Sequence, residues 1–133
     1  MNTNSCAAVH AGAARRDVTP PIGIYNRMWG AATHDRAEGV HRPITATVLA
    51  LGNDDPLLLV SLDWCLVWDE AVFAILCDPL VERAGGDPSR VILDCTHTHS
   101  VGLMSHDRVG QPGGEMILPY VERTAAALSD AAD

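Results

Sequence analysis

The segment RVILDCTHTHS, residues 90–100, carries two of the six histidines of the chain at alternate positions. It begins with apolar and β-branched residues, which favour a strand. Side chains at positions i and i+2 of a strand point to the same side, so His97 and His99 can present their imidazoles together. Zinc binds neutral imidazole nitrogen, and a catalytic zinc uses about three protein ligands. The pair can therefore supply two zinc ligands, or one ligand and a neighbouring donor.

The alternative is an ordinary polar strand end, in which Thr96 and Thr98 hydrogen bond to the imidazoles. Asp63 favours the metal interpretation, because it follows another apolar segment, LLLVSL. If the two strands are neighbours, its carboxylate arrives beside the histidines as a ligand or as the acceptor that orients an imidazole. An aspartate in a turn or before a helix is the alternative role for Asp63.

Five other polar residues are weaker candidates. His41 precedes a predicted strand and could reach the same region. Arg42 and Arg108 could hold an anion or a carbonyl oxygen, with solvated surface positions as the alternative. His34 and His106 lie in polar loops and are expected to be surface histidines.

The elements that must position these residues follow from the apolar patterns. The sequence predicts a short strand that ends before Pro20 and Pro21, a hairpin of strands within 44–52 and 57–64 around the turn GNDDP, and a strand within 89–96. A helix is predicted between, with Asp69 as N-cap and Gly85 at its end. Apolar residues at helical spacing in it are Val72, Phe73, Leu76, Leu80 and Val81.

Proline inside a helix removes a hydrogen bond, so Asp78 and Pro79 are predicted to break or restart that helix. Residues 57–96 then form a strand, helix, strand unit, whose two strands are normally parallel. A glycine-rich loop follows, and the chain closes with a helix that has Pro119 in its first turn. The expected fold class is α/β, with a mixed sheet, flanking helices and one domain over residues 1–133 that is an incomplete piece of a larger α/β catalytic domain.

Composition excludes several function classes. The 133 residues are 47% hydrophobic but contain no apolar run near the ~18 residues of a membrane span, and the start has no features of a signal peptide, so a cytoplasmic protein without an integral membrane segment is expected. The net charge of −8 argues against nucleic acid as a partner. The four cysteines, which form no CxxC pair, are expected to be free thiols; they are Cys6, Cys65, Cys77 and Cys95.

Four stretches in order give the chain a family resemblance: AGAARRDVTPPIG, GVHRPITATVLAL, LLLVSLDW and VILDCTHTHS. Together they resemble the N-terminal part of the neutral/alkaline non-lysosomal ceramidase family. The first and last stretches are fairly specific. The family's usual continuation after THTHS is Gly-Pro, whereas this chain has Val101 and Gly102, so its substrate loop differs.

The resemblance implies a zinc-dependent amidase that hydrolyses a ceramide or a related lipid or small-molecule N-acyl substrate. It implies that His97 is a zinc ligand and that His99 lies beside the metal and binds or polarises the substrate carbonyl, with Asp63 as the further catalytic candidate. The family's other ligands are a second histidine, a glutamate and a tyrosine from segments beyond Asp133. We therefore expect a missing C-terminal part, or another copy in a homo-oligomer, to complete the site, and weak zinc binding without it.

Two other functions remain open from the sequence. An amidohydrolase-type metal enzyme also has a strand that ends in His-x-His, but its barrel needs eight strand and helix units, and only 34 residues follow His99. A noncatalytic remnant or interaction domain would carry the histidines without using them.

Overall fold

The computed structural model describes residues 8–133. Its main elements are four strands and two α-helices: β1 (Ala11–Asp17), β2 (Thr45–Leu51), β3 (Leu57–Leu62), α1 (Glu70–Arg83), β4 (Val91–Cys95) and α2 (Ile117–Ala132). Short 3₁₀ turns cover Pro88–Arg90, His106–Arg108 and Gly114–Met116. None of the helices in this part of the chain is long and apolar enough to cross a membrane.

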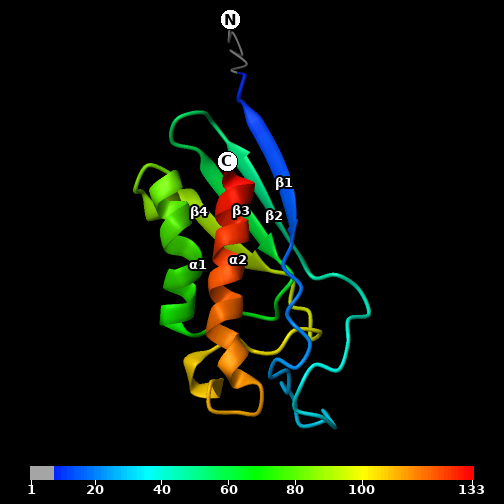
Figure 1. Cartoon of the computed structure of the whole chain (residues 1–133). Coiled ribbons are helices and arrows are strands. Elements are labelled where there is room, and N and C mark those ends of the chain that lie inside the picture. Colours follow the sequence, from blue (N-terminus) through cyan, green and yellow to red (C-terminus); the bar gives the residue numbers. More distant parts are fainter. Residues whose placement is uncertain (1–7) are drawn as a thin grey trace, which may run out of the picture.

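The strands form one mixed sheet in the order β1-β2-β3-β4. β1, β2 and β3 are antiparallel neighbours, and β3 and β4 are parallel. The hairpin and the strand, helix, strand unit are confirmed, as is the α/β class. Figure 1 shows α1 and α2 lying side by side across the same face of the sheet.

Alternate residues of the strands point their apolar side chains toward the helices, and these side chains are buried. Val48 pairs with Val60 and Ala46 with Leu62, and all four are nearly inaccessible to solvent. The other face is more open, since Ile92 on β4 is 52% exposed. The sheet therefore packs its core on the helical side.

The prediction that Pro79 would break the helix is wrong, because α1 runs through it to Arg83. Proline removes one backbone hydrogen bond, but Leu76 and Leu80 are fully buried on either side of it, and this packing holds the helix. The predicted end is confirmed at Gly85, which has a φ of +76°. Phe73 does not join the buried face, as its side chain is 48% exposed.

The first part of the glycine-rich loop before α2 is buried, whereas loops usually lie on the surface. Residues 101–105 are all buried, and a Cβ on Gly102 would lie 2.9 Å from the Tyr25 carbonyl oxygen. The loop therefore packs backbone against backbone with residues 23–26. α2 follows with the expected apolar face buried: Ile117, Val121, Ala125 and Leu128.

Asp69 joins the start of α1 to this loop. Its Oδ1 accepts hydrogen bonds from the N–H groups of Ala71 and Val72, as predicted for an N-cap, at 2.9 and 3.1 Å. Its Oδ2 accepts from the backbone N–H of His106 and contacts the ring Nδ1 at 3.0 Å. The His106 N–H is the largest cause that lowers the pKa of Asp69 to about 2. His106, expected to be a solvated histidine, thus has a structural contact.

We expect Asp69→Ala to lower the free energy of unfolding by about 1–2 kcal/mol at neutral pH, measured by urea denaturation, because α1 loses its N-cap. The carboxylate's pKa is lower in the folded chain than its ordinary value of 3.8, so its stabilisation is present above that pH and disappears as the pH falls toward 2. Asp78→Ala, on the exposed side of α1, is the matched control. Equal stability of the two variants at neutral pH would contradict this role.

Candidate metal centre

The parallel pairing of β3 and β4 brings two chain segments together at the carboxyl ends of these strands. The pairing continues beyond the strands: the Thr96 N–H donates to the Leu62 carbonyl oxygen and the His97 N–H to the Trp64 carbonyl oxygen, both at 3.0 Å. Ligand sites in α/β sheets commonly lie at such ends. The segment after β3 therefore lies directly beside the histidines.

Three side chains with metal-ligating atoms converge here: Cys65, His97 and His99. One ligand atom from each lies within 4.8 Å of the others. The Cys65 Sγ lies 3.7 Å from Nδ1 and 4.0 Å from Nε2 of His97. The cysteine is buried, whereas both histidines are exposed, so the cluster opens outward from the edge of the core.

The backbone of Cys65 also fixes the imidazole of His97. The ring Nδ1 lies 3.0 Å from the Cys65 carbonyl oxygen. A carbonyl oxygen can only accept, so Nδ1 carries the proton in this hydrogen bond, and in the neutral ring Nε2 has the lone pair. A carbonyl partner on the second nitrogen is the usual way in which proteins orient a metal-binding histidine.

The reason that the two imidazoles meet differs from the prediction. β4 ends at Cys95, and His97 has a φ of +62°, so the two residues do not follow the alternation of one extended strand. The ring centroids nevertheless lie 5.3 Å apart. A left-handed conformation is unfavourable for a residue with a Cβ and is often found at functional sites. Here it turns the His97 ring toward Cys65.

His99 is held on its other side by an aromatic contact. Its ring centroid lies 4.8 Å from that of Trp29, with the planes tilted by 34°. Trp29 belongs to the long segment between β1 and β2 and is 47% exposed. No pattern in the sequence predicts this contact, since the two residues are 70 positions apart.

Asp63 lies at the same edge of the sheet but has other partners. Its Oδ2 accepts from the backbone N–H and the hydroxyl of Thr45, and its Oδ1 accepts from the Thr96 hydroxyl at 3.1 Å. Burial acts to raise the pKa of Asp63, but the hydrogen bonds from Thr45 and Thr96 outweigh it and hold this pKa below its usual value. Its carboxylate thus binds the side chain of Thr96, one residue before His97. The catalytic role assigned to Asp63 stays a prediction.

The remaining candidates are distributed over other surroundings. His41 and Arg42 line a pocket beside Ser100 together with His34, and none of the three belongs to the donor cluster. Arg108 donates to the Arg27 carbonyl oxygen at 3.0 Å, and its guanidinium also lies over two aromatic rings, so it has a structural role.

The cysteines are in part as expected. Cys65, Cys77 and Cys95 are free, and Cys6 lies outside the described residues. Burial, with a contribution from Asp78, raises the pKa of the Cys77 thiol to about 11, and burial also raises the pKa of Cys95. Cys65, 32 positions before His97, is the donor that the sequence analysis missed.

The donor set fits zinc. Thiolate sulfur and imidazole nitrogen are common zinc ligands, at about 2.3 and 2.0–2.1 Å. Tetrahedral geometry with these bond lengths places donor atoms roughly 3.4 to 3.7 Å apart. The Cys65–His97 separation of 4.0 Å to Nε2 is close to this range, and a ligand atom of His99 lies within 4.8 Å of both residues.

A buried hydrogen-bond chain supports the segment that carries Cys65. The indole N–H of Trp64 donates to the Tyr120 hydroxyl at 2.9 Å, and this hydroxyl donates to the Val18 carbonyl oxygen at 2.7 Å. Trp64 and Tyr120 are almost completely buried. Burial raises the pKa of Tyr120 well above its usual value, so the phenol remains protonated and can donate. α2 is thereby joined to the segments after β1 and β3.

Comparisons with solved structures show a ceramidase-like fold. The chain matches a ceramidase complexed with C2 with a TM-score of 0.66, at 17% identity, over 92% of this chain and 20% of the other. It matches the neutral ceramidase from Pseudomonas aeruginosa with a TM-score of 0.59, at 18% identity, over 90% of this chain and 22% of the other. The chain therefore spans about a fifth of the length of these structures. No family model and no curated protein matches it.

These matches confirm the predicted resemblance at the level of the fold. They also agree with the interpretation of the mixed sheet as part of a larger domain.

We expect Tyr120→Phe to lower the free energy of unfolding by about 1–3 kcal/mol, because the buried Trp64 N–H loses its acceptor and the Val18 carbonyl oxygen its donor. Urea denaturation measures this change. Tyr25→Phe is the control, since Tyr25 is also buried but its hydroxyl makes no hydrogen bond to the described part of the chain. A loss no larger than that of the control would show that the hydrogen-bond chain contributes little.

Proposed function

We propose that this chain forms the first part of the catalytic domain of a zinc-dependent amide hydrolase of the neutral ceramidase type. The observation that carries the proposal is the convergence of Cys65, His97 and His99 at the carboxyl edge of a ceramidase-like sheet. Its substrate would be a ceramide or a related N-acyl compound.

Each residue of the cluster has a proposed role. His97 is a zinc ligand through Nε2, because its Nδ1 donates a hydrogen bond to the Cys65 carbonyl oxygen and is not available to a metal. Cys65 supplies a second donor from the buried side. His99 lies at the exposed side, where it completes the donor set or binds and polarises the amide carbonyl. When bound, zinc lowers the pKa of a water molecule toward 7 and polarises a carbonyl, which are the two needs of amide hydrolysis.

Asp63 supports this arrangement from behind. Its carboxylate accepts from Thr96, which lies next to His97 in the chain, and from Thr45 on β2. We propose that it positions the histidine segment and is not itself a zinc ligand. The sequence left two roles open for Asp63, a metal ligand or a residue that orients a histidine, and we propose the second.

The remaining parts of the site would come from outside residues 8–133. The matching ceramidase chains are about five times as long as this chain. Further ligands and the walls that recognise the acyl group would lie in such additional sequence, whether in the same polypeptide or in a partner. The amidohydrolase alternative is disfavoured, because that barrel consists of parallel strands, whereas β1, β2 and β3 are antiparallel.

Zinc titration by calorimetry tests the metal site. We expect one zinc per chain in the wild type, and a roughly 100-fold weaker affinity for His97→Ala, because one of few ligands is lost. His99→Ala should weaken binding less if this residue mainly contacts substrate. His10→Ala, an exposed histidine outside the cluster, should leave affinity unchanged. Wild-type affinity in His97→Ala would refute the site.

Cobalt substitution tests the cysteine separately. A thiolate bound to Co²⁺ gives an intense near-ultraviolet charge-transfer absorption, so the wild type should show this band and Cys65→Ser should lose it. Cys77→Ser, a buried cysteine of α1, should retain it. Full wild-type absorption in Cys65→Ser would exclude Cys65 as a ligand.

The catalytic part of the proposal is tested on the complete gene product with zinc and a short-chain ceramide, by measuring release of the fatty acid. We expect His97→Ala to reduce kcat/KM by at least about 1,000-fold, since the metal activates both reactants. Zinc binding without hydrolysis of this or other N-acyl amides would leave a metal-binding domain and overturn the hydrolase assignment.

A further inference from the structure

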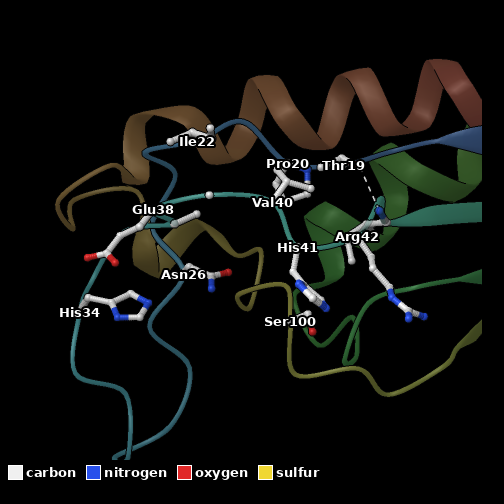
Figure 2. A pocket seen from close by; sticks show the side chains of 13 residues that line it. Thr19, Pro20, Ile22, Asn26, His34, Glu38, Val40, His41, Arg42 and Ser100 are labelled. Carbon is white, nitrogen blue, oxygen red and sulfur yellow. Dashed lines mark hydrogen bonds between the residues drawn. The ribbon is translucent and has the colours of Figure 1, made fainter.

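A pocket of about 400 Å³ lies beside the histidine segment and is not part of the donor cluster. Its lining comes mainly from residues 19–44, the long connection between β1 and β2, and it reaches Ser100, the residue after His99. Figure 2 shows Ser100 beneath His41, with the side chain of Arg42 extending on the same side. The pocket therefore reaches the segment that carries the two histidines of the proposed metal site.

The two ends of the pocket differ in charge. Figure 2 shows Glu38 and His34 at one end and His41 and Arg42 at the other. An anionic group would be repelled by Glu38 and attracted by Arg42. The orientation of a charged ligand is thereby fixed, with its anion at the end that adjoins Ser100.

Arg42 has an available guanidinium. Of the nine arginines, only Arg36 and Arg42 make no side-chain hydrogen bond, ion pair or aromatic contact within residues 8–133. Its backbone is anchored close by, since the Ile44 N–H donates to the Thr19 hydroxyl at 2.9 Å and the Ile44 carbonyl oxygen accepts from the Val18 N–H. A chain with a net charge of −8 repels anions as a whole, so an anionic ligand needs such a local cation.

The pocket also offers apolar surface. Pro20 and Ile44 line it, and Ile22 and Val40 are 62% and 51% exposed. Apolar side chains beside one cation suit an amphiphilic ligand with a hydrocarbon part and one carboxylate. Arginine binds a carboxylate with two parallel hydrogen bonds, which favours this group over a neutral hydroxyl.

We propose that this pocket binds the carboxylate of an N-acyl amino acid, with Arg42 as the recognising residue and His41 as a second donor. This inference rests on the proposed amide hydrolase function, because a ligand that reaches Ser100, the residue after His99, would have its amide near the metal. It names an acidic substrate class, in contrast to the neutral head group of a ceramide.

The test measures ligand binding, not turnover. It uses zinc-free protein, so its result does not depend on the metal site. The probe is N-hexanoylglycine, followed by amide chemical shifts in NMR titration, with N-hexanoylethanolamine as its neutral counterpart. We expect the acid to bind more tightly than the alcohol, with shifts centred on residues 38–44 and Ser100, and a roughly three- to tenfold loss of its affinity in Arg42→Gln. Arg36→Gln, the other arginine without a partner, is the matched control and should bind as the wild type does.

Three results would overturn the proposal: equal affinity for the acid and the alcohol, equal loss in Arg42→Gln and Arg36→Gln, or competition by inorganic phosphate as strong as that by the acylglycine. The last result would indicate a general anion site. His97→Ala separates the two proposals, because loss of zinc binding with retained acylglycine binding shows a working pocket beside a metal site. In the wild type, zinc binding without acylglycine binding refutes the pocket alone.

Discussion

The buried hydrogen bonds from Trp64 to Tyr120 and from Tyr120 to Val18 constrain the whole carboxyl edge of the sheet. A polar group that is buried without a partner costs about 1–3 kcal/mol, so the three groups can be buried only in this mutual arrangement. Since Trp64 lies two residues after the end of β3 and Tyr120 lies in the first turn of α2, the arrangement fixes α2 over the ends of β1 and β3. The position of the next residue, Cys65, follows from it.

The parallel pairing of β3 and β4 then places the histidine segment relative to Trp64 and Cys65. Parallel neighbours need a long crossover, which α1 supplies, and both strands end at the same edge. The Trp64 carbonyl oxygen accepts a hydrogen bond from the His97 backbone N–H. The Cys65 carbonyl oxygen accepts one from Nδ1 of the His97 ring. Two consecutive residues after β3 thus set both the backbone and the tautomer of His97, and they can hold its left-handed φ against the steric cost.

The sequence predicted what depends on local patterns. Strand alternation, the N-cap at Asp69 and the stop at Gly85 each act within a few residues, and all are present. The break at Pro79 was wrong because tertiary packing outweighs one lost hydrogen bond. Cys65 was missed because a lone cysteine in an apolar segment has the pattern of a core residue, and only the register of two strands places its thiol beside His97.

The burial of Cys65, His97 and His99 divides the proposed metal centre into a buried side and an accessible side. Cys65 is only 2% exposed and is held by the core, whereas the rings of His97 and His99 are exposed, and Trp29 contacts the outer one. A site in which every donor was buried would have no direction from which a substrate or a further ligand could approach. Here the segment after β3 orients the His97 imidazole through the Cys65 carbonyl oxygen, and Trp29 contacts the His99 ring. The pocket reaches Ser100, so one short segment, residues 97–100, contributes to both the proposed metal site and the proposed ligand pocket.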